Sequence, residues 1–481
     1  MSEITKLEPK ALWEIFDSIT KVPRPSKREA KIIAFLEDFA RNHKLEYKKD
    51  GAGNILIIKD ATPTMQDRPT VVLQSHMDMV CEKNSDVEFD FDSDPIQTYV
   101  SDGWVRARGT TLGADDGIGM ATALAVVTDD SLEHPRIEAL FTVDEETGLT
   151  GAFELGKDML TGHYLINLDS EDDGEIFIGC AGGIDTVATF SYSTEPAPVG
   201  MEWFKLTLSG LKGGHSGDNI NDGLGNSNKL MSRVLLEATP GLRLSLFDGG
   251  NLRNAIPREA YAVVGIPAAE VEKFKEKVAW FAHVFQSSFH DTDPDVKLEI
   301  TPADTPSSVI DLNTQNNLLS SIHGVINGVI AMSKTIDDLV ETSTNLASVK
   351  FTDDNHIVVT SSQRSSVESA KHNAAAVVGE TFERAGAKVE HSDGYPGWEP
   401  NTSSRLLKVA EETYSKLFGD KAKVKAIHAG LECGLFLEKY PDLEMISVGP
   451  TLRGVHSPEE RLEIATVDKF WMWITEILRN I

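Results

Sequence analysis

The segment TVVLQSHMDMV (70–80) begins as an apolar, β-branched run and ends in a histidine and an aspartate. An apolar run of this kind is typical of a buried strand. Comparable runs are NILIIK (54–59), IEALFTV (137–143) and YLINL (164–168), and IGMATALAVVT (118–128) predicts a helix between them. Strands that alternate with helices predict an α/β fold with a mostly parallel, doubly wound sheet.

Acidic residues and histidines stand close to the ends of such apolar runs. Ligands of open α/β sheets gather beyond the carboxyl ends of the strands, so we expect these side chains to lie together. The candidates are His76, Asp115, Glu146, Asp169 and His456. Two imidazoles and three carboxylates suit a site for two divalent ions such as Zn²⁺, which favours a hydrolase.

Two pairs of polar residues suggest how such a site works. His76 and Asp78 are two residues apart on an extended strand, so one can bind a metal while the other orients it. Glu145 and Glu146 are adjacent at a strand end, so one can bind metal while the other serves as a base. Taken alone, a chance polar pair and a solvated acidic loop explain these pairs as well.

Other motifs narrow the choice of chemistry. LGADDGIG (112–119) lacks the Gly-x-Gly-x-x-Gly fingerprint and gives no support to a dehydrogenase; an acidic turn before a helix also explains it. DSEDDG (169–174) resembles a calcium loop, but Cys180 stands where the bidentate glutamate belongs. DFDSDP (90–95) fails because Pro95 stands where that loop needs glycine.

The pattern changes after about residue 186. Runs at 204–210, 242–249, 259–266 and 296–301 with helices near 225–238 and 269–286 follow the β-α-β-β-α-β order of ferredoxin-like domains. A second, less complete copy is expected from a helix near 313–330 to KVEH (388–391). We predict an inserted α+β lid domain, 187–398, of two ferredoxin-like halves, and a discontinuous catalytic domain, 1–186 and 399–481.

The composition excludes several classes of protein. The 481 residues include 46 basic and 75 acidic ones, and a net charge of -29 disfavours binding to nucleic acid or an anionic membrane. The first residues do not resemble a secretory signal, and no run is apolar enough to span a membrane. Three scattered cysteines form no disulfide framework. We expect a cytoplasmic globular protein.

Eight strings together resemble one family, the di-zinc metallopeptidases of the carnosinase and aminoacylase group. They are VLQSHMDMV, RARGTTLGADDG, VDEETGLTGA, INLDS, GGHSG, NLRNAIPREA, HAGLECG and GVHSPEER. The resemblance implies that His76, Asp115, Glu146, Asp169 and His456 bind two Zn²⁺ ions, for which Co²⁺ or Mn²⁺ can substitute. It further implies that Asp115 bridges the ions, Asp78 orients His76, and Glu145 is the general base acting on a water shared by the ions.

The resemblance also implies residues that bind substrate. His215 of GGHSG would stabilise the oxyanion, and Asn254 and Arg364 would hold the C-terminal carboxylate. Glu432 and Gly434 of HAGLECG would line the pocket, and either Glu432 or Asp173 would meet the free amine.

The activity that the resemblance implies is hydrolysis of unblocked dipeptides, including Xaa-His dipeptides such as β-alanyl-histidine. An aminotripeptidase or an N-acyl-amino-acid deacylase on the same scaffold is the alternative, and a non-catalytic metal- or peptide-binding protein is a remote one. The resemblance is also compatible with a homodimer, and His215 can act within its own chain or across a dimer interface.

Overall fold

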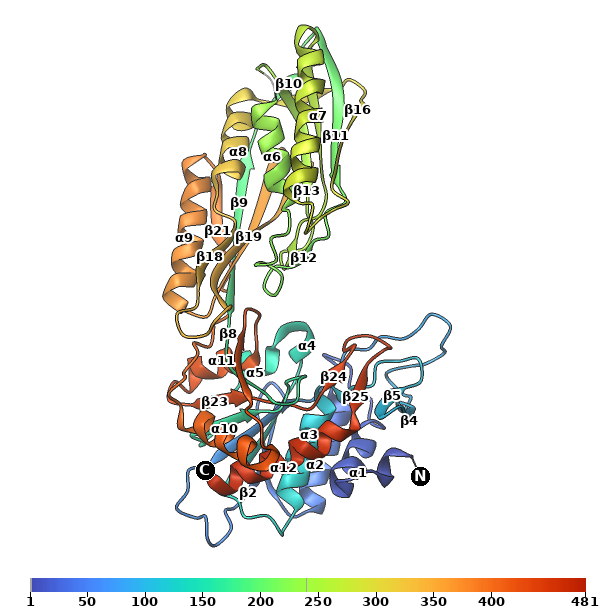
Figure 1. Ribbon diagram of the computed structural model, residues 1–481, viewed down its shortest axis with the longest axis vertical. Helices are drawn as coiled ribbons and strands as arrows, with labels where there is room; N and C mark the ends of the chain where they lie inside the picture. The colour runs from blue at the N-terminus through green and yellow to red at the C-terminus, as the bar shows by residue number, and fades with distance from the viewer. Residues whose placement is uncertain (1, 239) are drawn as a thin grey trace. The chain divides into compact units, whose positions relative to one another are not determined.

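The computed structural model describes residues 2–238 and 240–481, which divide into two compact units (Figure 1). Unit 1 runs to Gly179 and resumes over Pro400–Ala426 and Leu431–Ile481; unit 2 comprises Cys180–Glu399 and Ile427–Gly430. The predicted catalytic domain includes 180–186 and 427–430. They group with unit 2 because strand β9 already begins at Gly182 and the Ala181 amide donates to the carbonyls of Ile427 and Ala429.

Unit 1 is built on a mixed sheet. In spatial order its strands are β1 (Glu46–Lys49), β2 (Ile55–Lys59), β6 (Ile137–Thr142), β3 (Val71–His76), β7 (Tyr164–Asn167), β23 (Glu444–Ser447), β8 (Glu175–Cys180) and β22 (Lys423–Ile427). The four central strands from β6 to β23 are parallel, whereas β1–β2, β2–β6 and β23–β8 pair antiparallel. The predicted α/β class is confirmed, but the sheet is parallel only at its centre.

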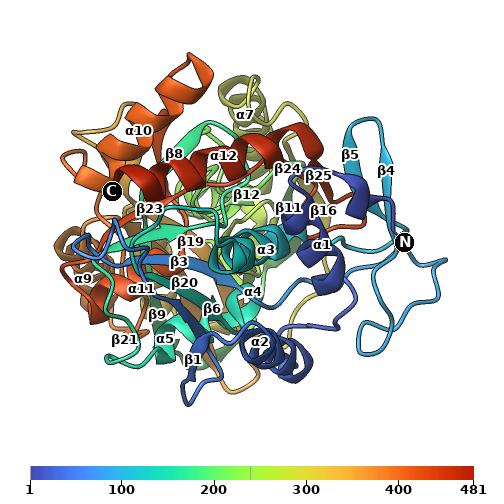
Figure 2. The same ribbon diagram turned by 90° about the horizontal axis from the view of Figure 1, so that it is seen from below.

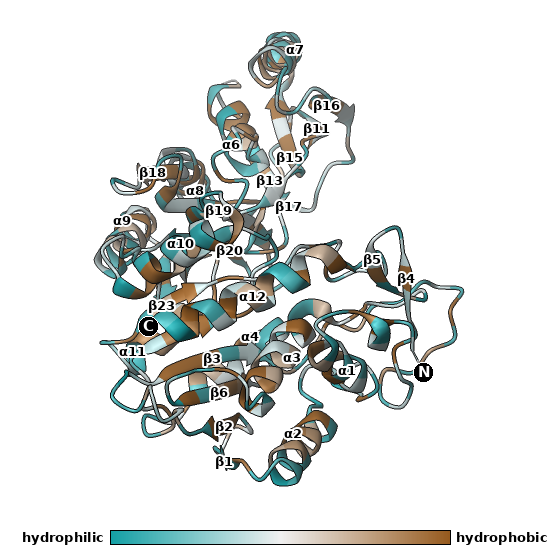
Figure 3. Ribbon diagram, turned by 60° about the horizontal axis from the view of Figure 1, so that its bottom comes forward, coloured by the Kyte–Doolittle hydropathy of each residue, from teal (hydrophilic) through white to brown (hydrophobic). Residues whose placement is uncertain are grey.

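The central strands are apolar throughout because both faces of the sheet are covered. Every residue of β3 and β6 is buried, and Figure 3 shows both strands largely in the hydrophobic colour. Strands covered on both faces have continuous apolar runs rather than alternating ones. This is why the sequence identifies these strands.

Helices surround this sheet. They are α1 (Lys10–Ile19), α2 (Ala30–Asn42), α3 (Ala114–Thr128), α4 (Glu145–Gly148), α5 (Thr150–Glu154), α10 (Arg405–Phe418), α11 (Glu432–Lys439) and α12 (Ile464–Asn480). Helix α3 is buried along nearly its whole length and lies beside β3 (Figure 2). A small separate sheet has the order β24 (Leu452–Arg453), β25 (Arg461–Glu463), β5 (Trp104–Ala107) and β4 (Thr98–Ser101).

Unit 2 contains a large antiparallel sheet with two ferredoxin-like strand orders. The first half is β16 (Lys297–Pro302), β11 (Met201–Ser209), β15 (Ala260–Pro267) and β13 (Arg243–Gly249); the second is β19 (Val340–Phe351), β20 (His356–Ser365), β9 (Gly182–Ser191) and β21 (Lys388–His391). The halves join where Gly249 pairs with Val349. The second half is therefore complete, and its first strand, β9, precedes the first half in the sequence.

Four helices pack against this sheet, namely α6 (Ser227–Glu237), α7 (Val271–Ser288), α8 (Leu312–Gly324) and α9 (Glu368–Arg384). The helix predicted over 313–330 ends at Gly324, because Val325 is extended and β18 (Gly328–Met332) pairs with β19. Strand β20 directs Ile357 and Val359 into the apolar core, so the alternate residues Ser362 and Arg364 lie on the opposite face. Two short ladders, β10 (Thr194–Pro196) with β17 (Ser308–Ile310) and β12 (Gly214–His215) with β14 (Ala255–Ile256), complete the unit.

Among the helices that the structure describes, none is both long enough and apolar enough to cross a membrane.

Candidate metal centre

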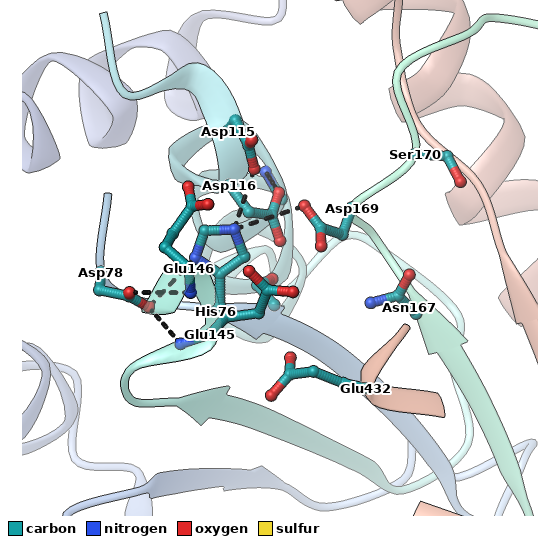
Figure 4. Close-up of polar contacts among 12 residues, drawn as sticks. His76, Asp78, Asp115, Asp116, Glu145, Glu146, Asn167, Asp169, Ser170 and Glu432 are labelled. Carbon is teal, nitrogen blue, oxygen red and sulfur yellow. Dashed lines mark hydrogen bonds and ion pairs between the residues drawn. The ribbon is translucent and has the colours of Figure 1, made fainter. Parts of the chain in front are cut away.

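The five predicted ligand residues lie together in unit 1. His76 ends β3, Asp115 lies in the first turn of α3, Glu146 lies in α4, Asp169 follows β7, and His456 lies in the loop between β24 and β25. Figure 4 shows the side chains of His76, Asp115, Glu146 and Asp169 converging beyond the ends of the strands. The parallel strands carry their ligands to one edge of the sheet, as expected for this class of fold.

These residues form two potential ligand groups with one common member. His76, Asp115 and Asp169 make one group; Asp115, Glu146 and His456 make the other. The two oxygens of the Asp115 carboxylate face different histidines: Oδ1 is 2.9 Å from Nε2 of His76, and Oδ2 is 3.2 Å from Nε2 of His456. The remaining carboxylates are close as well, with Asp169 Oδ1 at 3.5 Å from His76 Nε2 and Glu146 Oε2 at 3.0 Å from His456 Nε2.

Asp78 links the histidine to the loop of the paired glutamates. Its Oδ1 lies 3.3 Å from Nδ1 of His76, the nitrogen that faces away from Asp115. The same carboxylate accepts the amides of Glu145 and Glu146 at 3.0 and 3.3 Å. Asp78 therefore fixes the ring of His76 and the start of α4 at once, which is the arrangement that orients metal-binding histidines.

The cluster carries more negative charge than its own imidazoles can balance. Burial and the neighbouring carboxylates raise the pKa values of Glu145 and Asp169 well above the ordinary carboxyl range. Hydrogen bonds to Asp115 and Glu146 raise the pKa of His456 to about 11. Buried carboxylates that repel one another need a cation, so this donor set fits divalent metal ions.

Asp116 does not share the position of Asp115. Its Oδ1 accepts the amide of Gly119 inside α3, and burial raises the pKa of its carboxyl group well above the ordinary range. Of the two aspartates, Asp115 is the one that contacts both histidines and belongs to both potential ligand groups.

Unit 2 contains a cavity of about 690 Å³ that includes two of the predicted substrate-binding residues. Asn254 and Arg364 both line it, together with Gly183, Ile184, Asp185, Leu252, Arg253, Ser362, Ser392, Asp393, Gly394 and Tyr395. The buried Arg364 guanidinium donates to the Tyr395 hydroxyl at 2.9 Å and to Ser216 Oγ at 3.4 Å. Within residues 2–238 and 240–481, no carboxylate forms an ion pair with Arg364.

His215 lies next to this cavity on the short strand β12, paired with Ala255. Its Nδ1 is 3.2 Å from the Asp218 amide and 3.1 Å from the Asp218 carboxylate. Nδ1 accepts from the amide when the ring is neutral and donates to the carboxylate when it is protonated. When Nδ1 accepts from the Asp218 amide, the hydrogen of the neutral ring is on Nε2 and can be donated from there.

A family model for peptidase family M20/M25/M40 matches residues 72–480. The chain belongs to this family. A cytosol non-specific dipeptidase of Escherichia coli (strain K12) is 42% identical over 486 aligned residues, which cover 100% of this chain and 99% of that protein. The predicted metallopeptidase family is thereby confirmed.

A solved structure shows that the M20 fold extends over the whole chain. The crystal structure of aminoacylhistidine dipeptidase from Vibrio alginolyticus is 41% identical, with a TM-score of 0.94, covering 100% of this chain and 98% of that one. The aminopeptidase PepT structure from Bacillus cereus, at 18% identity and a TM-score of 0.58, covers 98% of both chains and shows the fold alone.

Three residues predicted for the pocket of this M20 chain have the following contacts. The Asp173 carboxylate forms an ion pair with Lys469. Gly434 lies inside α11, where its amide donates to the carbonyl of Leu431. Glu432 is buried and accepts from Gln74 and Thr142 at 2.7 and 2.9 Å through Oε2, while Oε1 has no hydrogen-bond partner among the described residues.

Two residues beside Arg364, Tyr395 and His428, were not predicted from the sequence. Tyr395 belongs to GYPGWEP, whose Gly and Pro content indicated only a hinge. His428 begins HAGLECG, and its Nε2 lies 2.7 Å from Ser343 Oγ. A single histidine is a weak signal, and only the pairing of strands reveals that Ser343 lies opposite Arg364.

Proposed function

We propose that this M20 peptidase is a metal-dependent dipeptidase that hydrolyses the peptide bond of unblocked dipeptides. The observation that carries the proposal is the shared position of Asp115 between two ligand groups. It is supported by 42% identity over the whole chain to a protein named a cytosol non-specific dipeptidase. The same name supports a cytoplasmic location.

Two divalent ions, Zn²⁺ by preference and Co²⁺ or Mn²⁺ as substitutes, fit the centre. His76, Asp115 and Asp169 would hold one, and Asp115, Glu146 and His456 the other. Bound ions of this kind polarise a carbonyl oxygen and make water nucleophilic near neutral pH.

Glu145 would move the proton during hydrolysis. It lies in a group with His76 and Glu146, yet it belongs to neither group that contains Asp115. A carboxylate beside the ligands accepts the proton of the attacking water and returns it to the departing amine. Asp78 keeps Glu145 in place through its backbone amide.

The unit 2 residues would hold the substrate. A buried guanidinium without a carboxylate partner is costly, so Arg364 is suited to the C-terminal carboxylate of a dipeptide, with Asn254 beside it. His215 would donate from Nε2 to the oxyanion that develops in the transition state. Recognition of the C-terminal carboxylate would favour very short peptides over longer ones.

Glu432 would receive the free amine of the substrate. It is a buried carboxylate of unit 1 with one unpartnered oxygen, and a positively charged amine is the natural partner of such an oxygen.

A homodimer stays a prediction.

The test is hydrolysis by purified protein loaded with Zn²⁺, Co²⁺ or Mn²⁺, assayed on dipeptides, tripeptides and N-acetyl amino acids. Release of amino acids from dipeptides, stopped by a chelator and restored by metal, is the expected result. Activity confined to tripeptides or acylated amino acids would select the alternatives on this scaffold. Absence of all hydrolysis with two ions bound would leave a binding protein.

A further inference from the structure

The turn that carries Asp115 is held by two buried charged side chains that are remote in sequence. Arg24 precedes α2, and Glu460 follows His456 by four residues. Both are 2% exposed. They contact the backbone of the turn rather than its side chains.

Arg24 ties the end of β3 to this turn. Its guanidinium donates to the carbonyl oxygens of Met77 and Asp78, which directly follow His76, and to that of Gly113. One planar cation thus joins the strand end that carries His76 to the turn that carries Asp115. A lysine ammonium, which is a point charge, cannot reproduce this fork of donors.

Two glycines provide the space for the guanidinium. A Cβ atom added to Gly113 would lie 2.7 Å from Nη2 of Arg24, and one added to Gly117 would lie 2.8 Å from it. Gly113 also has φ 67°, a conformation that other residues rarely adopt. The glycines that flank Asp115 therefore serve the approach of Arg24 as well as the turn itself.

Glu460 holds the same turn through its amides. Oε2 accepts the amides of Leu112 and Gly113 at 2.7 and 3.0 Å, and Oε1 accepts those of Ala114 and Asp115 at 2.7 and 3.3 Å. Because Glu460 shares a loop with His456, its carboxylate ties the second histidine to the turn.

Neither charge is used in an ion pair. Among the described residues, no carboxylate lies within ion-pair distance of the Arg24 guanidinium, and no basic group lies that close to Glu460. Burying a charge is costly unless hydrogen bonds compensate it. Here the compensating partners are the backbone groups that position three ligands: His76, Asp115 and His456.

We propose that Arg24 and Glu460 are positioning residues that fix Asp115 at the shared position and thereby determine how tightly the two metal ions are held. The inference rests on the proposed function in one respect, namely that the cluster binds metal. Neither side chain touches an ion or the substrate; both act through the backbone of the ligand loops.

The experiment measures ion affinity in Arg24→Lys and Glu460→Gln. In Arg24→Lys the positive charge remains, but the planar set of N–H donors is lost. In Glu460→Gln the shape of the side chain remains, but its NH₂ group faces backbone amides that also donate. We expect each variant to bind Co²⁺ or Zn²⁺ about 10- to 100-fold more weakly in chelator competition. The absorption spectrum of the Co²⁺-loaded variants should also change, because the ligand geometry relaxes.

Two matched control variants separate positioning from simple stability. Lys229 is a half-buried cation that also donates to three carbonyl oxygens, those of Ile322, His323 and Val325, but it lies in unit 2. Glu138, on β6, is a buried carboxylate that accepts the amides of Thr161 and Gly162. Lys229→Met and Glu138→Gln should lower the urea midpoint of the metal-free protein without changing ion affinity.

A third variant alters the guanidinium site while Arg24 remains. In Gly117→Ala the new methyl group presses on Arg24, so ion affinity should fall as it does in Arg24→Lys. Wild-type affinity in Arg24→Lys, Glu460→Gln and Gly117→Ala would overturn the inference, as would an equal loss in the two controls. Both of these results leave the proposed function intact. A wild-type protein that binds no ion would overturn the proposed function, and this inference with it.

Discussion

Asp115 and Glu145 illustrate how neighbouring carboxylates take different roles through their contacts. Each carboxylate oxygen of Asp115 lies close to a different imidazole, that of His76 or that of His456. Glu145 faces the same cluster, but its amide is fixed by Asp78, and burial raises the pKa of its carboxyl group. These contacts are the reason for proposing Asp115 as a shared ligand and Glu145 as a proton carrier, although both side chains have the same chemistry.

Glu145→Gln should lower kcat by about 10²- to 10⁴-fold, because the proton carrier is lost. The five ligand residues are untouched, so the metal content of the protein, measured by elemental analysis, should stay at the wild-type value. Glu146→Gln provides the contrast, since it should lose metal and activity together. Loss of metal from Glu145→Gln would contradict the assignment of Glu145 as base.

Tyr395→Phe tests whether the hydroxyl positions Arg364 for the substrate carboxylate. The hydroxyl accepts from Arg364 Nη1 at 2.9 Å, and the ring packs against Gly183 and Gly430. Loss of one hydrogen bond to a charged group should raise KM for dipeptides about 10-fold. The kcat should be unchanged, because the chemistry lies elsewhere. A lower kcat at unchanged KM would contradict this role.

At the scale of elements, the segment 427–430 carries a histidine into the polar face of the unit 2 sheet. Burial and the nearby Arg364 charge lower the pKa of His428 to about 4. The ordinary pKa of a histidine is about 6.5. Below that pH, and down to about pH 4, the imidazole is protonated in the unfolded chain and neutral in the folded chain. The free energy of unfolding must therefore decrease as the pH falls from about 6.5 towards 4.

His428→Gln should remove this pH dependence. Between pH 7 and pH 5 the wild-type protein should lose roughly 2 kcal/mol more stability than the variant. Urea unfolding of both proteins at several pH values measures the difference, and the other titrating groups cancel in the comparison. Equal pH slopes for the two proteins would show that His428 is not held neutral.

The start of α2 shows a local sequence rule that tertiary contacts override. Ser26 and Glu29 have the Ser-x-x-Glu spacing of a capping box, but α2 begins at Ala30 without a side-chain cap. The Glu29 carboxylate instead accepts the amides of Lys27 and Asp144, and Ser26 bonds to Asp78. The capping box does not form because Glu29 binds the Asp144 amide before α4 and Ser26 binds Asp78 after β3.

At the scale of the whole molecule, metal should stabilise one unit selectively. All ligand residues belong to unit 1, and ions that bind only the folded state add about 2.7 kcal/mol at a concentration 100 times Kd. Calorimetry with Zn²⁺ or with a chelator should show a higher Tm for the unit 1 transition only. Asp115→Asn should abolish most of that shift, because both groups lose their shared ligand. An equal shift of the unit 2 transition would contradict this arrangement.

The sequence by itself determined the α/β class, the central strands and the polar residues His76, Glu146 and Asp169, which lie at or shortly after the ends of three of them. A strand buried on both faces must be apolar throughout, as β3 and β6 are, and a polar side chain that directly follows such a strand is conspicuous. The first ferredoxin-like half could also be predicted, because its elements are consecutive in the chain.

Only the tertiary structure decided the features that depend on distant or backbone partners. Strand β9 completes the second half by pairing with residues more than 150 positions away, and no local pattern encodes such a pairing. The choice of Asp115 over Asp116 depends on which carboxylate faces the two histidines. The contacts of Arg24 and Glu460 were equally hidden, because their partners are carbonyl and amide groups that every residue carries and no sequence can single out.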